Sequence, residues 1–242
     1  MQESVPREEA NWLLSSLSEP SYRSVSDLCE TVETPRDHSV SKSDAIIPFA
    51  YFPQSGCLSV ISVVNGNIRV EVGTVGWEGM TGLSFLHGVD STPTETFAQV
   101  PGLSKRIPRV AFKKELTTNA ELAAVMNRYA QFWTEQSSRS ISCNGVHSVE
   151  ARCARWLLAT HDRVEGDVLP LTQEFLAIML AVRRASVSVA AESLRKAGLI
   201  NYSRGKITVL DRRRLEAASC DCYASIQSSY DRLLPSPKRR VT

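Results

Sequence analysis

Residues 169–210 read LPLTQEFLAIMLAVRRASVSVAAESLRKAGLINYSRGKITVL, and their spacing predicts two short helices followed by a strand hairpin. Thr172 is a suitable N-cap for the first helix, and Leu171 and Leu176 are spaced as a hydrophobic staple around it. Apolar side chains then recur at helical spacing up to Leu180. The first half of this stretch is therefore typical of a helix that packs one face against a core.

A second helix is predicted from about 183 to 197, ending before Gly198, because glycine favours the left-handed backbone that closes many helices. Residues 199–202 and 207–210 are strand-like and flank a tight turn at 203–206, as in the wing of a winged helix. In the second helix the predicted buried stripe is Val187, Ala190, Ala191 and Leu194, which leaves Arg184, Ala185, Ser188 and Val189 facing outward.

This order of elements resembles the C-terminal domain of the Crp/Fnr superfamily of bacterial transcription regulators. The resemblance covers the chain from about residue 11 to residue 223. One departure is Ala181, where the family's turn usually has glycine; a left-handed alanine there costs roughly 1 kcal/mol. The other stretches that carry the resemblance are YFPQSG at 51–56, VGTVGWEGMTG at 72–82, QVPG at 99–102, HSVEARCARWLL at 147–158, and Asp211-Arg, Leu215-Glu and Cys220-Asp-Cys-Tyr in 211–223.

The resemblance implies an α+β fold with an N-terminal β-roll (jelly roll) sensor domain, a long dimerisation helix and a C-terminal winged helix-turn-helix. The residues agree with it. Short alternating runs fill 31–109, and Asn65-Gly66 is a strong hairpin signal. We expect four parts: a cyclic-nucleotide-binding-like sensor domain at 11–118, a dimerisation helix at 119–142, a winged helix-turn-helix domain at 143–223 and a tail at 224–242.

The long helix is predicted from about Asn119 to Ser140, because apolar residues recur at i, i+3, i+4 and i+7. Its apolar stripe is wide and aromatic, so we expect it to pack on the sensor domain and on its copy in a second subunit. Packing on its own domain alone is the alternative. The stripe consists of Leu122, Val125, Met126, Tyr129, Phe132 and Trp133.

The predicted function is sequence-specific binding of double-stranded DNA by a homodimer on a palindromic operator. By the resemblance, Arg184 contacts a base and Ser188 lies on the same outward face. The other predicted DNA contacts lie at helix starts and on the wing, where phosphates would pass: Thr172, Gln173, Arg183, Ser186, Arg204 and Lys206.

The sensor domain is predicted to lack the usual cyclic-nucleotide site. In the family a Gly-Glu pair meets the ribose, and an arginine pairs with the phosphate. Gly76-Trp-Glu-Gly79 stands in the first place, but no Lys or Arg occurs between Arg69 and Lys105, and the expected phosphate position has Asp90 and Glu95 instead. A buried phosphate without a cation is costly. We therefore expect no cyclic-AMP dependence. The speculative effector pocket comprises Trp77, Glu78, Gly79 and Thr96, with Glu78 either anchoring the glycine-rich turn or contacting an unknown ligand.

The charge distribution agrees with a sensor joined to a polyanion binder. Residues 1–143 contain 12 basic and 16 acidic side chains, whereas 144–242 contain 16 basic and 10 acidic ones. No apolar run approaches the length that a bilayer requires, and residues 1–20 lack the pattern of a signal peptide. We expect a cytoplasmic protein without a membrane partner, with RNA polymerase as a further candidate partner.

No metal site, cofactor or disulfide framework is predicted from the six cysteines and four histidines. Only Cys220 and Cys222 stand close together, and no second pair at ligand spacing accompanies them, whereas a zinc or iron–sulfur site needs about four ligands. Small half-buried residues are the favoured interpretation of this pair, and a redox role is the alternative. The four histidines are isolated along the chain.

Two other classes of protein fit the sequence less well than a regulator does. A cupin-like enzyme would need a metal triad or a nucleophile–base pair, but the strand region offers only His38 and His87. We therefore predict no enzymatic activity. A protein–protein adaptor with a winged helix that no longer binds DNA is the remaining alternative, and the basic residues on the expected DNA face disfavour it.

Overall fold

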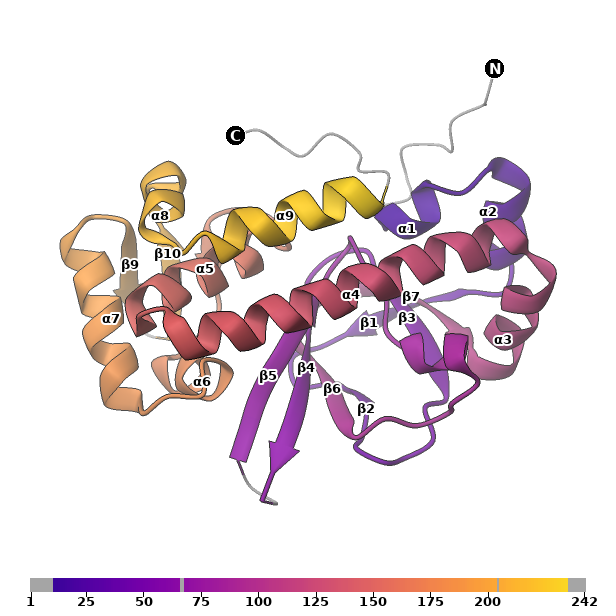
Figure 1. Ribbon diagram of the computed structural model, residues 1–242, viewed down its shortest axis with the longest axis horizontal. Helices are drawn as coiled ribbons and strands as arrows, with labels where there is room; N and C mark the ends of the chain where they lie inside the picture. Colours follow the sequence, from indigo (N-terminus) through magenta and orange to yellow (C-terminus); the bar gives the residue numbers. More distant parts are fainter. Residues whose placement is uncertain (1–10, 66–67, 204, 235–242) are drawn as a thin grey trace.

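The computed structural model describes residues 11–65, 68–203 and 205–234. A β-roll forms one end of the molecule and a helical domain with a small hairpin forms the other (Figure 1). One long helix runs between these two ends, and the last helix of the described chain lies beside it. This is the mixed α and β architecture expected from the sequence.

The β-roll consists of two antiparallel sheets. One has the order β1-β7-β3 and the other the order β2-β6-β4-β5. The predicted hairpin is confirmed, because Val64 of β4 pairs with Ile68 of β5 and Asn65 has a φ of 52°. Its other two turn residues, 66 and 67, lie outside the described residues. The strands are β1 (Glu30–Thr34), β2 (Ser39–Ser41), β3 (Phe49–Pro53), β4 (Cys57–Val64), β5 (Ile68–Val75), β6 (Thr94–Val100) and β7 (Gly102–Pro108).

Short helices cover the end of the β-roll and close its core. The segments are α1 (Trp12–Ser15), α2 (Glu19–Ser26), the 3-10 helix η1 (Leu83–His87) and α3 (Arg109–Thr118). The core beneath them joins Phe52, Phe112 and Met126, all of them completely buried. Residues 1–10 lie outside the described residues.

The long helix α4 (Ala120–Val146) extends six residues beyond the predicted end at Ser140. No proline interrupts it, and Asn119 caps its start by accepting a hydrogen bond from the backbone N–H of Leu122 at 3.0 Å. The expectation for its apolar stripe is wrong in part. The stripe packs within its own chain, where Tyr129 is 0% exposed and Phe132 2%, so these side chains cannot meet a second subunit.

The helical domain has the order of elements predicted for a winged helix-turn-helix. A three-stranded antiparallel sheet of order β8-β10-β9 lies against its helices. The wing strands are each within one residue of the predicted bounds. The elements are α5 (Val149–His161), β8 (Val168–Leu169), α6 (Gln173–Met179), α7 (Arg184–Lys196), β9 (Ile200–Ser203), β10 (Lys206–Val209) and α8 (Arg212–Ala218).

The predicted tail at 224–242 is wrong for the part that the structure describes. Residues Cys222–Leu233 form a helix, α9, which packs along α4 (Figure 1). Tyr230 is only 3% exposed, its ring lies 5.1 Å from that of Phe132, and it belongs to the core of the β-roll. The chain thus returns from the winged domain to the sensor domain. Residues 235–242 lie outside the described residues.

Candidate DNA-binding interface and interdomain contacts

The first helix of the motif, α6, begins and ends as its sequence predicts. The Thr172 hydroxyl accepts a hydrogen bond from the backbone N–H of Phe175 at 3.1 Å, and Leu176 is completely buried. At the other end, the N–H of Val182 donates to the carbonyl of Ala177 at 3.0 Å, and Ala181 has a φ of 52°. This is a Schellman motif with alanine in the left-handed position.

The second helix, α7, presents one side to the core and the other to solvent. The predicted buried stripe is confirmed, since Val187, Ala190, Ala191 and Leu194 are at most 3% exposed. Gly198 closes the helix with a φ of 72° and a second Schellman motif. The outer side carries exposed Arg183, Arg184 and Ala185 at its start, and Val189 is 73% exposed.

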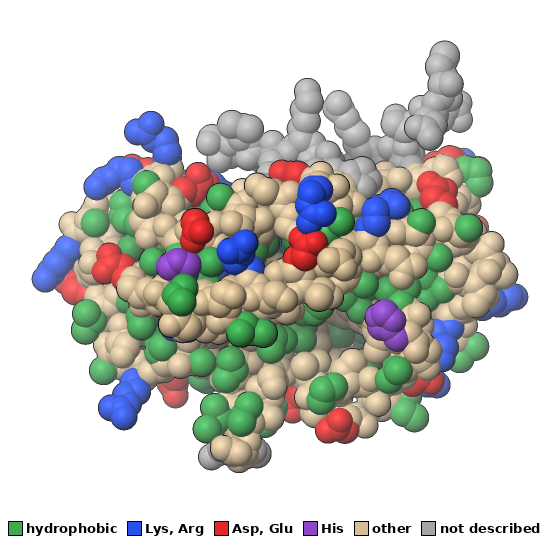
Figure 2. Space-filling view, viewed as in Figure 1, with side chains coloured by type: hydrophobic (Ala, Val, Ile, Leu, Met, Phe, Trp, Pro, Cys, Tyr) green, Lys and Arg blue, Asp and Glu red, His purple; other side chains and the backbone are tan. Residues whose placement is uncertain are grey.

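The predicted phosphate contacts at the start of α6 and on the wing lie close together. A Cβ placed on Gly205 in the wing turn would lie 3.5 Å from Cγ2 of Thr172. Lys206 follows Gly205 and is exposed. Arg204 lies outside the described residues. Basic side chains project from this end of the molecule, around α7 and α8 (Figure 2).

Two of the residues predicted to contact DNA form a hydrogen bond with each other within the motif. The Ser188 hydroxyl donates to the side-chain carbonyl of Gln173 at 2.8 Å, which joins the middle of α7 to the start of α6. Ser186 is half-buried in the first turn of α7. Gln173 and Ser188 therefore fix how the two helices cross, in addition to any contact with DNA.

In the sensor domain, Glu78 is buried and tied to the winged domain. Its carboxylate lies 2.8 Å from Nη2 of Arg163 and accepts a hydrogen bond from the N–H of Gly76 at 3.2 Å. Burial acts to lower the pKa of Arg163, but the charge and hydrogen bond of Glu78, together with other nearby acidic groups, outweigh burial and hold that pKa above its ordinary value. Glu78 thus anchors the glycine-rich turn. Its cationic partner, 85 residues away, was not predicted.

The four residues of the predicted effector pocket do not line one common cavity. Trp77 and Glu78 line a cavity between the two domains. Gly79 is buried against the helix α4, because a Cβ there would lie 2.1 Å from Oη of Tyr129. Thr96 lines a separate cavity of about 100 Å³ inside the β-roll.

That small cavity has no cation among its described lining residues. Hydroxyl and apolar side chains surround it, and Trp133 of α4 occupies one wall. Asp90 and Glu95 do not line it. The expectation that these two carboxylates lie at a phosphate position is therefore wrong for this cavity, and both are paired with cations instead. Asp90 pairs with Lys113 at 2.9 Å and with Arg109, and Glu95 pairs with Arg69 at 2.8 Å.

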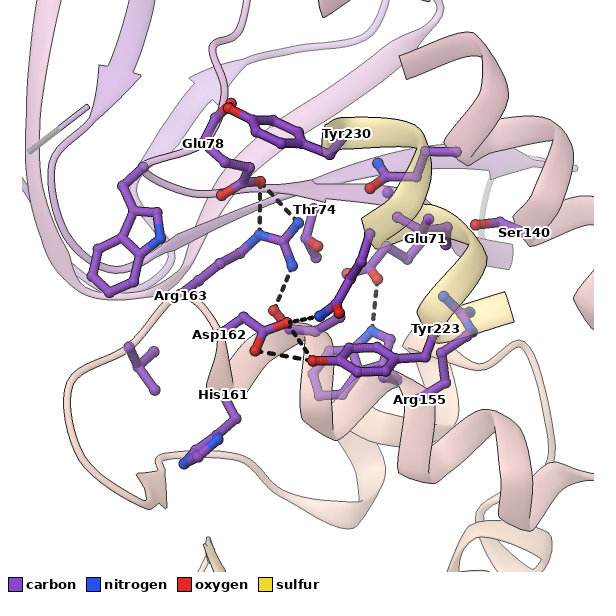
Figure 3. Close-up of a pocket in the computed structure, with 18 of the residues that line it drawn as sticks. Glu71, Thr74, Glu78, Ser140, Arg155, His161, Asp162, Arg163, Tyr223 and Tyr230 are labelled. Carbon is purple, nitrogen blue, oxygen red and sulfur yellow. Dashed lines mark hydrogen bonds and ion pairs between the residues drawn. The ribbon is translucent and has the colours of Figure 1, made fainter. Parts of the chain in front are cut away.

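The larger cavity, of about 700 Å³, lies between the β-roll and the winged domain (Figure 3). Glu71 of β5 accepts a hydrogen bond from Nε1 of Trp156 on α5 at 2.6 Å. Burial raises the pKa of Glu71 above its ordinary value. On the opposite wall, Asp162 pairs with Arg212 at 2.6 Å and accepts from the Tyr223 hydroxyl at 2.9 Å. Charged side chains of both domains therefore face this space.

Exposed residues form a regular row along the side of α4 that faces solvent. Its residues are spaced alternately three and four apart, and none is charged. Such spacing places them on one seam of the helix. The row consists of Ala124, Asn127, Gln131, Thr134, Ser138, Ile141 and Gly145, all of them exposed.

The cysteine pair near the C-terminus does have companions, contrary to the sequence-based expectation. Cys143 and His147 at the end of α4 join Cys220 and Cys222, and the four ligand-type atoms lie within 4.8 Å of one another. Burial raises the pKa of Cys222 to about 12, and the neighbouring thiols add to this effect. The sequence could not show the cluster, because 73 residues separate His147 from Cys220.

Comparisons with known proteins agree with this architecture. Residues 151–218 match the family model of the Crp-like helix-turn-helix domain. FixK2 from Bradyrhizobium japonicum superimposes with a TM-score of 0.67 at 16% identity over 79% of this chain and 98% of that one. TTHA1359, a transcriptional regulator of the CRP/FNR family from Thermus thermophilus, gives 0.61 at 19% identity over 78% and 98%. The c-di-GMP-responsive regulator CLP from Xanthomonas campestris gives 0.62 at 15% identity over 78% and 98%.

No curated protein matches the chain by sequence. The helix-turn-helix match and the shared fold define the class of protein: residues 151–218 are a Crp-like helix-turn-helix domain, and the chain has the fold of solved regulators of the CRP/FNR family. These matches are to regulators and not to the cupin-like enzyme considered from the sequence. Among the described residues, no helix combines the length and apolar character needed to span a bilayer.

Proposed function

We propose that two copies of the chain bind a palindromic operator, with α7 of each copy in a major groove. The observation that carries this proposal is the exposed start of α7, where the Arg183 and Arg184 side chains lie outside the core. Arginine at this place can form a bidentate contact with guanine. Two-fold symmetry then sets the half-sites about 34–36 Å apart, centre to centre.

The domain division that supports this function follows the predicted one, with two changes. We assign residues 11–118 to the sensor domain and let the connecting helix extend from 119 to 146. The winged domain follows and ends near 221. Helix α9 then returns to the sensor domain, where the Tyr230 hydroxyl donates to the backbone carbonyl of Glu78 at 3.0 Å. A movement of either domain is therefore linked to α9 as well as to α4.

The uncharged row on α4 supports a homodimer built on the solvent-exposed side of that helix. Small side chains such as Ser138 and Gly145 allow two helices to approach closely, and Ile141 is 74% exposed. A charged side chain introduced into this row would face the same charge on the second copy across the two-fold axis, and the two charges would repel each other. We expect Ser138→Glu to dissociate the dimer in sedimentation equilibrium, whereas Arg128→Glu, outside the row, leaves the dimer intact.

We also propose that DNA binding requires no cyclic nucleotide. The cavity in the β-roll is about 100 Å³, whereas pockets for small-molecule ligands are typically about 300–1,000 Å³. Its described lining residues include no Lys or Arg to pair with a phosphate. Titration calorimetry with cyclic AMP and cyclic GMP tests this point. Micromolar binding accompanied by a gain in operator affinity would contradict it.

Selection of DNA from a random library with the purified full-length protein tests the function as a whole. We expect an enriched motif with two inverted half-sites, selected equally well with and without cyclic AMP. Selection of no sequence, with retained weak binding to any duplex, would contradict the operator. No binding to DNA at all would favour the adaptor.

A further inference from the structure

We propose that Cys143, His147, Cys220 and Cys222 bind one zinc ion, which fastens the end of α4 to the start of α9. The ligand atoms come from two places in the chain. Cys143 lies in the last turn of α4, and His147 is the residue that follows the helix, where its backbone N–H donates to the carbonyl of Cys143 at 3.1 Å. Cys220 and Cys222 flank Asp221, the residue that begins α9.

The distances fit a single tetrahedral ion. Cys143 Sγ lies 3.5 Å from Cys220 Sγ, and Cys222 Sγ lies 3.6 Å from Nδ1 of His147. With zinc–sulfur bonds of about 2.3 Å and zinc–nitrogen bonds of about 2.0 Å, the edges of a regular tetrahedron are about 3.8 Å and 3.5 Å. All four atoms lie within 4.8 Å of one another, which suits one ion shared by all of them. In a multi-iron cluster, different ligands bind different irons and stand farther apart.

The surroundings orient the histidine as metal sites require. Nε2 of His147 lies 3.3 Å from a carboxylate oxygen of Asp221, so Nε2 can carry the proton while Nδ1 faces the sulfur atoms. A carboxylate behind a ligating histidine is the usual arrangement at zinc sites.

The charge near the cluster supports the same assignment. Three thiolates and one Zn²⁺ carry a net charge of −1. Arg152 is 6% exposed and its Nε has no hydrogen-bond partner in the described structure. Its guanidinium is close enough to interact electrostatically with Cys143 and Cys220. A buried arginine is costly without a nearby anion, and the zinc–thiolate group supplies one.

The choice of zinc follows from the ligand set. Three thiolates and one imidazole are a combination that zinc takes in structural sites, where four protein ligands leave no open position. Cys143, Cys220 and Cys222 are at most 7% exposed, so the site is closed on three sides. Bound here, the ion would link the helix between the domains to the helix that returns to the sensor domain, with no catalytic role.

The experiment measures metal in the full-length protein purified under reducing conditions without a chelator. We expect one zinc per chain by mass spectrometry of the elements, and visible absorption bands of tetrahedral thiolate-bound Co²⁺ after exchange. Cys222→Ser and Cys143→Ser should each lose the stoichiometric zinc. Cys153→Ala, which removes a buried thiol outside the cluster, should keep it. Asp221→Asn should bind zinc about 10–100-fold more weakly while keeping all four ligands.

Three results would overturn the proposal. The first is wild-type protein that holds no zinc and gives no tetrahedral Co²⁺ spectrum. The second is a Cys143–Cys220 disulfide in the isolated protein, together with no zinc binding after reduction. The third is stoichiometric iron and inorganic sulfide instead of zinc. The Asp221→Asn variant keeps all four ligands, so its Co²⁺ spectrum still tests the site if a serine variant fails to fold.

Discussion

At position 181, in the turn between α6 and α7, an alanine takes a backbone conformation that glycine adopts at less cost. Its φ is 52°, while Gly198 closes α7 with a φ of 72° in the same type of motif. A left-handed alanine costs about 1–2 kcal/mol, and glycine returns about 0.5–1 kcal/mol of this through the entropy of the unfolded chain. Ala181→Gly should therefore raise the free energy of unfolding by up to about 1 kcal/mol.

The matched control is Gly198→Ala. A Cβ at 198 meets nothing within 4 Å, so the change tests backbone conformation alone. It should lower the free energy of unfolding by about 1 kcal/mol. Urea denaturation of both variants measures the two effects. Changes of the same sign would show that the turn at 181 is not governed by its left-handed backbone.

Arg184, the first residue of α7, is the predicted reader of a base. A bidentate contact with guanine contributes about 1–3 kcal/mol of discrimination. Arg184→Ala should relax preference at one symmetric pair of operator positions and leave the other positions unchanged. Comparison of motifs selected by wild type and variant measures this. Arg195→Ala, in the last turn of the same helix, is the control, and an unchanged Arg184→Ala motif means that another residue reads the base.

Short-range and long-range features of these sites differed in how far the sequence could predict them. The cap at Thr172 and the stripe of α7 depend on neighbours within about five positions, so spacing alone located them. The left-handed residue at 181 was located by the family resemblance. The pairing of Glu78 with Arg163 depends on how two domains dock, and nothing in the local sequence encodes it. The same holds for the four-residue cysteine and histidine cluster.

At the scale of elements, the wing and α6 together form the surface that we propose for phosphates, because Gly205 in the wing turn lies beside Thr172. Each cationic contact with a phosphate releases counterions, so its loss lowers the slope of log affinity against log salt by about 0.9. Lys206→Ala should show this decrease on every DNA sequence tested. The control is Arg213→Ala, an exposed arginine on α8. A changed base preference with an unchanged slope would place Lys206 in the groove.

Helix α9 was missed although its sequence carried a signal. Tyr223, Ile226, Tyr230 and Leu233 recur at helical spacing. Ile226, Tyr230 and Leu233 pack on the sensor core, whereas Tyr223 packs in the core of the winged domain. The end of the chain is basic and contains proline, which is typical of a tail, and this composition favoured a tail for the whole of 224–242. The mistaken expectation for the apolar stripe of α4 has the same cause. We expected a second subunit to share this stripe, but α9 and the β-roll cover it.

At the scale of the whole molecule, Glu71 joins the β-roll to the winged domain through hydrogen bonds, and its burial favours the neutral carboxyl group. Ser59 Oγ lies 2.5 Å from Oε1 of Gln99 and 2.7 Å from Oε2 of Glu71, but a hydroxyl has one proton to donate. A protonated Glu71 can donate to Ser59, which then donates to Gln99. The third partner, Nε1 of Trp156, donates to the other carboxyl oxygen in either form.

This network predicts how the stability of the docked domains depends on pH. Burial raises the pKa of Glu71 above its ordinary value of 4.5, outweighing the hydrogen bonds that lower it. The stabilising contribution of a group with a raised pKa is complete below the ordinary value and is lost as pH rises through the raised one. Glu71→Gln stays neutral at every pH. The variant should therefore gain free energy of unfolding relative to wild type as pH rises from about 4 to about 8. Urea denaturation across this range measures the difference, with exposed Glu165→Gln as the control. A difference that stays constant with pH would mean that folding leaves the pKa of Glu71 unchanged and would contradict the prediction.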